Sequence, residues 1–285
     1  AYLNRSRLRY LLKDESGSRR DRDIAQRKIS EYKTRLSDST YSIYADTTHR
    51  FDRLLSFDAN VAGSTFGRIT SKSADNRLAL LPLFRFTLST PDSLSTVTAG
   101  RYHSQREADF RRRIGNGYLT LTARESNVPA DSLVVLDKRY ALELMAQPAS
   151  WELLFQRGIT QTLIKQYTNA VGTFTSAIDQ YPANPFLYLN RSTTRAEMID
   201  FISSIDNSYQ RITIESDPAK RLQNSQSRTY NYDEAIADLN KAAKLYPDFP
   251  YTYYNRANLM ALSGKLPEAY NDYTKALSLI HISEP

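Results

Sequence analysis

Apolar residues in the second half of the chain recur at the spacing of amphipathic helices. Ala170 and Ala177 are seven residues apart, which places them on one face of a helix, with Phe174 between them. Two small side chains on that face would let a neighbouring helix come close, while the phenyl ring fills the adjacent gap. Pro182 then ends the helix, because proline lacks an N–H and disfavours helix in the residue before it. The pattern predicts a series of packed helices.

The first half of the chain shows two other patterns. Ile29, Leu36 and Ile43 lie a heptad apart among charged residues, which predicts an amphipathic helix from residue 19 to about residue 48. The period then changes to two, which predicts strands within residues 78–88 and 118–122, and a third strand at 53–57. Pro82 favours an edge strand or a late strand start. We expect a small α+β insertion here.

An internal repeat links the helical segments. The pair Asn-Arg, preceded by two aromatic or apolar residues, occurs at Asn4, Asn190 and Asn255, and the last two copies are 65 residues apart. Pro148 and Pro182 are 34 residues apart, and Pro182 and Pro247 are again 65 apart. Since 65 is 34 plus 31, the spacing indicates a 34-residue period with one insertion of 31 residues.

The residues of the second helices follow one family pattern. The set Ala170, Phe174, Ala177 and Pro182 recurs as Ala235, Leu239, Ala242 and Pro247, and then as Ala269, Tyr273 and Ala276. In these residues the chain resembles tetratricopeptide repeat (TPR) proteins over about half of its length. The resemblance implies a mainly α fold: a TPR α-solenoid of helix-turn-helix repeats, with the small α+β insertion in the N-terminal half. The first helices depart from the family pattern, with Leu154, Tyr188 and Tyr253 where Trp is usual and Arg157, Arg191 and Arg256 where Leu is usual.

The repeat phase sets the expected domain boundaries. The expected segments are 1–14 as the first helix of a split repeat, 15–130 as the α+β insertion, 131–150 as the second helix of the split repeat, 151–184 as a TPR, 185–249 as a TPR with an insertion at 199–229, and 250–276 as a TPR. Residues 277–285 resemble a translated sequencing adapter and are expected to be an artefactual tail. We expect the chain to be a fragment of a larger protein. The Tyr-rich Asn-Arg repeats resemble large bacterial cell-envelope TPR proteins, which would favour an exported or periplasmic location.

The resemblance also implies where a partner binds. TPR proteins hold peptides on the concave wall formed by their first helices. By repeat phase, the residues of this predicted groove are Phe155, Ile159, Phe186, Leu189, Asn190, Tyr251, Tyr254, Asn255 and Asn258. A carboxamide offers both a donor and an acceptor, so asparagine can bracket a peptide backbone. The alternative is that these side chains only pack against neighbouring helices or the insertions. The two-cation grip of the chaperone-binding subclass is absent, because Phe155, Ile159, Tyr251 and Asn255 occupy its positions.

Charge suggests a second hypothesis. Residues 1–130 contain 23 Lys or Arg against 14 Asp or Glu, a balance of +9, whereas residues 131–285 contain 15 against 17, a balance of −2. The basic clusters at 19–22, 50–53 and 111–113 could attract nucleic acid or another polyanion. Acidic residues interrupt them, and no stacking aromatics are interleaved with them, so a solvated face is favoured.

Motifs for catalysis are missing from the sequence. The chain has no cysteine and only three histidines, and it contains no H-E-x-x-H, Gly-rich phosphate loop or G-x-S-x-G sequence. We therefore expect no enzyme activity, no cofactor and no metal site. No stretch of 18 apolar residues occurs either, so no membrane span is expected in this chain. The favoured function is a non-enzymatic scaffold that binds a protein or peptide partner.

Overall fold

The computed structural model describes residues 1–36, 82–89, 104–212 and 231–282, which separate into two compact units. The smaller unit contains α1 (Tyr2–Leu11) and α2 (Glu15–Leu36). The larger unit contains all the other described helices and strands. Of the expected elements, the strand at 53–57, the end of the first-half helix and residues 78–81 of the second strand lie outside the described residues.

The smaller unit is a pair of packed helices, and its contacts include arginine ion pairs to Asp21 and a serine contact. The Arg5 guanidinium donates from Nε and Nη2 to the two carboxylate oxygens of Asp21, at 2.7 and 2.6 Å. The Ser6 hydroxyl donates to the carbonyl oxygen of Ser18 at 2.8 Å. Lys13, between the helices, has a φ of 65°. These contacts connect the first helix to the second at separations of 16 and 12 residues.

The same contacts recur in the larger unit at the repeat spacing. Arg256 bonds Asp272 through Nε and Nη2, again 16 residues apart, and Arg191 bonds Asp238 in the same way, 47 apart, which is 16 plus the 31-residue insertion. Positive φ also recurs in phase, at Lys165 and Gly264. The pair α1/α2 therefore has the internal contacts of a complete repeat. We expected 131–150 to be the second helix for residues 1–14; in the structure α2 takes that place, and it begins at Glu15 rather than at residue 19.

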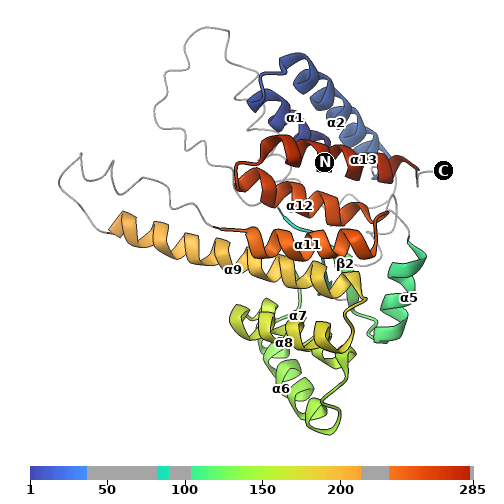
Figure 1. Ribbon diagram of the computed structural model, residues 1–285, viewed down its shortest axis with the longest axis vertical. Coiled ribbons are helices and arrows are strands. Elements are labelled where there is room, and N and C mark those ends of the chain that lie inside the picture. The colour runs from blue at the N-terminus through green and yellow to red at the C-terminus, as the bar shows by residue number, and fades with distance from the viewer. Residues whose placement is uncertain (37–81, 90–103, 213–230, 283–285) are drawn as a thin grey trace. The chain divides into compact units, whose positions relative to one another are not determined.

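The larger unit is a succession of helices, each packed on the next. Their bounds are α6 (Ala130–Ala146), α7 (Trp151–Leu163), α8 (Tyr167–Gln180), α9 (Pro185–Ile212), α11 (Asp233–Leu245), α12 (Pro250–Leu262) and α13 (Leu266–Ile282). Neighbours in the chain are neighbours in space from α6 to α13 (Figure 1). Residues 199–212, the start of the expected insertion, lengthen α9, and the rest of the insertion up to residue 230 lies outside the described residues.

Small residues at the expected positions form the seams between these helices. Ala170, Phe174 and Ala177 of α8 have no measurable exposure. Their counterparts in α11 and α13 are equally buried: Ala235, Leu239, Ala242, Ala269, Tyr273 and Ala276. Close approach at an alanine and ring packing beside it explain why this spacing repeats. The expected fold class, a mainly α solenoid of helix pairs with a small sheet, is confirmed.

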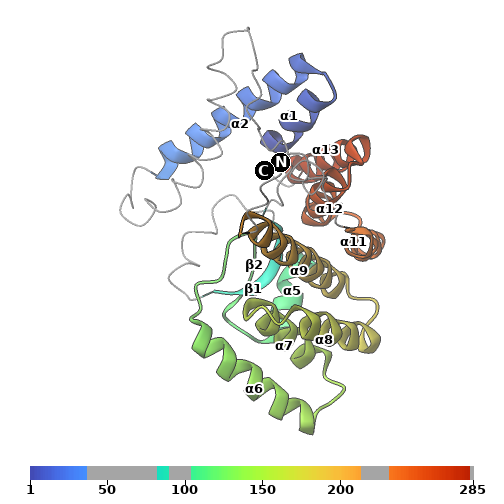
Figure 2. The ribbon, with the colours of Figure 1, turned by 90° about the vertical axis from the view of Figure 1, so that its left-hand side faces the viewer.

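The strands β1 (Arg85–Leu88) and β2 (Leu119–Thr122) form a two-stranded antiparallel sheet in the described part of the chain. Phe86 lies opposite Leu121 and Leu88 opposite Leu119. The strand predicted within 118–122 is confirmed. β1 begins only after Pro82, which agrees with the late strand start that this proline favoured. Figure 2 shows the sheet beside α7 and α9.

One helix of the larger unit was not predicted. α5 (Gln105–Ile114) begins after Ser104, whose hydroxyl accepts from the Glu107 N–H, and it ends at Gly115 with a φ of 69°. Serine followed three residues later by glutamate is a capping signal, and a glycine with positive φ is a common helix end. These two signals were present in the sequence and would have located the helix.

Candidate functional site

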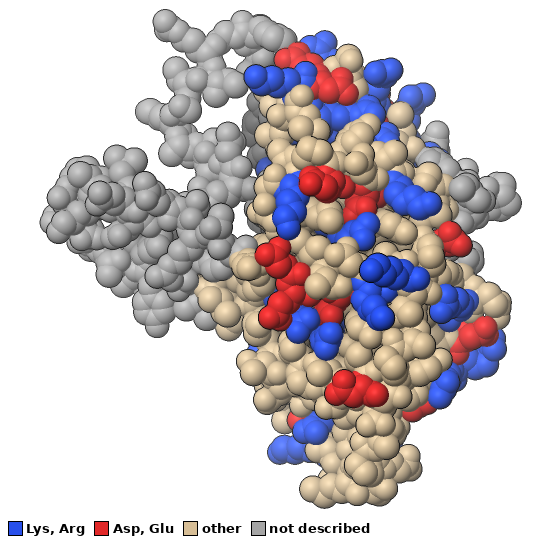
Figure 3. Space-filling model, viewed as in Figure 1, with Lys and Arg blue, Asp and Glu red and all other residues tan. Residues whose placement is uncertain are grey.

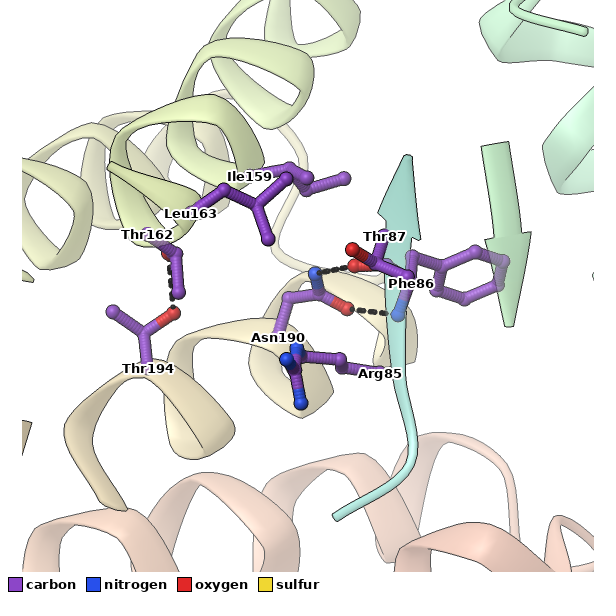
Figure 4. Close-up of a pocket in the computed structure, with 8 residues that line it drawn as sticks. All are labelled: Arg85, Phe86, Thr87, Ile159, Thr162, Leu163, Asn190 and Thr194. Atoms are coloured by element: carbon purple, nitrogen blue, oxygen red, sulfur yellow. Dashed lines mark hydrogen bonds between the residues drawn. The ribbon is translucent and has the colours of Figure 1, made fainter. Parts of the chain in front are cut away.

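Two asparagines of the predicted groove hold the backbone of an extended segment of the same chain. Asn190 of α9 accepts a hydrogen bond from the Phe86 N–H at 3.0 Å and donates one to the Phe86 carbonyl oxygen at 2.9 Å (Figure 4). Asn255 of α12 makes the same two bonds to Phe84, at 2.8 and 2.7 Å. The two asparagines occupy one repeat phase, so successive units bind alternate residues of the segment. We call this side of α7, α9 and α12 the strand-binding face.

The alternation follows from strand geometry. In an antiparallel ladder, residues point their N–H and C=O groups alternately toward and away from the neighbouring strand. The backbone N–H and C=O groups of Phe84 and Phe86 point toward the asparagines. Those of Arg85 and Thr87 therefore point toward β2, where these residues lie opposite Thr122 and Thr120. One edge of β1 is thus paired with β2 and the other with carboxamides. A strand edge that would otherwise have unpaired amides is satisfied by two side chains.

Aromatic side chains of the predicted groove surround the two clamped phenylalanines. The Phe84 ring lies 4.1 Å from the Tyr251 ring and 5.3 Å, edge to face, from the Tyr254 ring, measured between centroids. The Phe86 ring has no measurable exposure. It packs within 6.0 Å of three rings, which belong to Phe110, Phe155 and Phe186. Each such pair adds about 1 kcal/mol beyond burial.

The remaining residues of the predicted groove are buried too. Ile159 lies beside Arg85, Phe86 and Thr87 around a small hollow (Figure 4). Leu189 is fully buried in the helix array. Asn258 is also buried, and its carboxamide oxygen accepts a hydrogen bond from the Tyr273 hydroxyl of α13. The Nδ2 atom of Asn258 has no hydrogen-bond partner. The structure therefore brings most of the predicted set onto Phe84 and β1.

The residue between the two clamped positions, Arg85, belongs to a charged pair. The Arg85 guanidinium lies 2.8 Å from the Glu197 carboxylate, and the two side chains retain 12% and 22% of their exposure. Glu197 is seven residues after Asn190, so both project from one face of α9. Burial raises the pKa of the Glu197 carboxyl; the charge of Arg85 acts against this rise, and the nearby carboxylates Asp200 and Glu125 add to it.

Sequence reasoning missed the occupant of the strand-binding face. It placed residues 78–88 in a strand, and it expected asparagines to bracket a backbone, but it did not join the two. No sequence signal related the two, because Phe84 and Phe86 lie 171 and 104 residues from Asn255 and Asn190. Glu197 carried no signal, since an isolated glutamate in a helix is usually exposed.

The basic cluster of α5 is neutralised by acidic neighbours. In α5, Arg111 pairs with Glu107, Arg112 with Asp109, and Arg113 with Glu152 of α7. On the face drawn in Figure 3, positive and negative side chains are interspersed. The cluster at 50–53 lies outside the described residues.

The described residues also bear on two other kinds of site. They contain no cluster of three or more His, Asp or Glu side chains that could hold a metal ion. None of their helices is both long enough and apolar enough to cross a bilayer.

Comparisons with known proteins give only weak likenesses. No protein-family model matches the chain, and no curated protein matches it. Among solved structures, MamA MSR-1 C2 is similar with a TM-score of 0.38 at 17% identity, covering 54% of this chain and 70% of that one. A crystal structure of MamA is similar with a TM-score of 0.24 at 20% identity, covering 64% and 98%. Likenesses at these scores carry no conclusion about function.

Proposed function

We propose that this protein is a non-enzymatic protein-interaction scaffold whose strand-binding face holds an extended polypeptide segment. The observation that carries the proposal is the pair of bidentate clamps from Asn190 and Asn255 to alternate backbone residues. Backbone bonds of this kind recognise extended conformation, while the flanking aromatic side chains supply apolar contact area. The chain's own β1 is the occupant in this structure, and a partner segment of the same shape would bind by replacing it.

The residues that would contact such a partner are the groove residues expected from repeat phase that contact Phe84 or β1. They are Phe155, Ile159, Phe186, Asn190, Tyr251, Tyr254 and Asn255. Of these, Phe155, Ile159 and Phe186 also belong to the main core cluster. Their removal would weaken folding together with binding, so the asparagines are the better probes of function.

A peptide of residues 82–89 tests the proposal. The receptor is the full chain carrying Phe84→Ser and Phe86→Ser, here called the open-face variant, in which β1 no longer fills the aromatic pockets. We expect the labelled peptide to bind the open-face variant at least about tenfold more tightly than it binds the parent chain, whose face is occupied. A control peptide with serine at both phenylalanine positions should not bind.

Thermal melting gives a second readout of the same binding. A ligand that binds only the folded chain raises its melting temperature, so the peptide should stabilise the open-face variant even if the two serines have weakened it. Absence of both binding and thermal stabilisation would overturn the proposal.

The polyanion hypothesis is not carried forward. It rested on the basic balance of residues 1–130, and the described arginines of α5 are in ion pairs with acidic neighbours. In α1, Arg5 is paired with Asp21 in the same manner. No observation on the described residues favours this second function.

A further inference from the structure

The two clamps by themselves do not fix which residues they hold. Asn190 and Asn255 bond only to backbone N–H and C=O groups, and every residue except proline offers both. A slide by two residues that placed Phe86 and Leu88 in the clamps would make the same four hydrogen bonds, because the side-chain period of a strand is two. The opposite slide would place Pro82, which has no N–H, in the Asn255 clamp and lose one of the four. Something besides the clamps must therefore set the register of the bound segment.

Side-chain contacts at three consecutive positions supply that information. The aromatic side chains pack on Phe84, just before β1, and on Phe86, which lie on one face of the extended segment. Arg85, between them, projects to the opposite face and meets Glu197 at 2.8 Å. A shift of two residues in either direction would place Leu83 or Thr87 beside the Glu197 carboxylate, and neither side chain can neutralise it.

The carboxylate occurs in only one of the two clamping units. The position in α12 that corresponds to Glu197 of α9, 65 residues later, is Leu262. The middle residue of the bound segment therefore meets an acidic group from α9 alone. A carboxylate that is largely removed from water is stable as an anion only beside a cation.

We infer that Glu197 selects a basic side chain at the residue between the two clamped positions, so that the ligand class of the strand-binding face is an extended aromatic–basic–aromatic segment. This inference rests on the proposed function, because it names the kind of segment that the face would accept. Glu197 acts in it as a specificity-determining residue, while the asparagines bind any extended backbone.

Peptides that differ at one position test the inference. The open-face variant is titrated with the peptide of residues 82–89 and with a peptide in which methionine replaces the arginine. Methionine keeps a long apolar stem and removes the charge. We expect the arginine peptide to bind at least about tenfold more tightly than the methionine peptide, since loss of one partner from a largely buried charge pair weakens binding strongly.

The matched receptor is the open-face variant that also carries Glu197→Gln. There the preference for arginine should fall to within about twofold, because no carboxylate remains to pair with it. Equal affinity of the two peptides for the receptor that retains Glu197 would overturn the inference while leaving the proposed function intact. Failure of both peptides to bind would instead count against the proposed function.

A measurement in the parent chain covers the case in which the open-face variant does not fold. Arg85→Met, Glu197→Gln and the double variant are compared by urea unfolding. If Glu197 interacts with the charge at position 85, the double variant should be no less stable than the Arg85→Met chain. The effects of the two substitutions on the unfolding free energy would then be strongly non-additive. Additive losses would show that the carboxylate does not sense the arginine and would overturn the inference.

Discussion

Gly158 of α7 lies so close to the ring of Phe174 in α8 that a Cβ atom on the glycine would sit 2.7 Å from Cε1 of the ring. Phe174 has no measurable exposure and cannot move into solvent. The contact explains why this position of the first helix lacks a side chain, and it makes the seam between the two helices sensitive to a single methyl group.

Gly158→Ala should therefore destabilise the protein. Because the added methyl group overpacks a fully buried ring, we expect a loss of about 1–3 kcal/mol in the free energy of unfolding, measured by urea denaturation. Gly172→Ala is the matched control, since a Cβ there meets nothing within 4 Å. That change should stabilise α8 by about 0.5–1 kcal/mol, because alanine loses less backbone entropy in a helix than glycine. Equal effects of the two substitutions would refute the close approach.

Asp238 is the acceptor for two arginines. Both Arg191 and Arg195 approach it to 2.6 Å, and its side chain retains only 5% exposure. Asp238→Ala leaves two part-buried cations without this partner, so we expect a loss of about 3 kcal/mol in unfolding free energy. The control is Asp109→Ala, which removes an exposed i,i+3 pair with Arg112 and should cost about 0.5 kcal/mol or less. A small effect at Asp238 would mean that this repeated ion pair does not hold the helices together.

The stability of the chain should depend on pH through Glu197. Burial raises the pKa of this carboxyl above its ordinary value of 4.5, so the folded chain keeps its proton at pH values where the unfolded chain has released it. The unfolded state then binds fewer protons, and the unfolding free energy falls as the pH rises from about 4.5 through the folded-state pKa. Glu197→Gln removes this contribution. The stability of the Gln variant relative to the parent should therefore increase across that window, and parallel pH profiles would contradict the assignment.

Local signals in the sequence were sufficient to predict the helix seams. Ala170 and Ala177 at heptad spacing, with a ring between them, have only one packing arrangement that fits a 34-residue period, and their repetition in α11 and α13 confirmed it. The pairing of α1 was harder to predict. Arg22 stands in α2 where Phe174 or Leu239 stands elsewhere, so the apolar pattern there was weak, and the ion pair of Arg5 with Asp21 became visible only in three dimensions.

For the strand-binding face, the sequence predicted the asparagines but not the segment that they bind. Repeat phase located Asn190 and Asn255 on first helices, because that position is set by local periodicity. Their partners Phe86 and Phe84 lie 104 and 171 residues away in the chain. No periodicity relates segments so far apart, so the match between an alternating strand and two repeating carboxamides could be seen only once the chain had folded.

The two asparagines are central to the account, and one titration tests them most directly. The peptide of residues 82–89 is titrated into the open-face variant and into the same variant carrying Asn190→Leu and Asn255→Leu. Leucine keeps the number and branching of the side-chain heavy atoms and removes all four backbone hydrogen bonds. Since each net hydrogen bond contributes about 1 kcal/mol, we predict an affinity loss of about 100-fold or more in the leucine receptor. An unchanged affinity would contradict the claim that these carboxamides hold the strand.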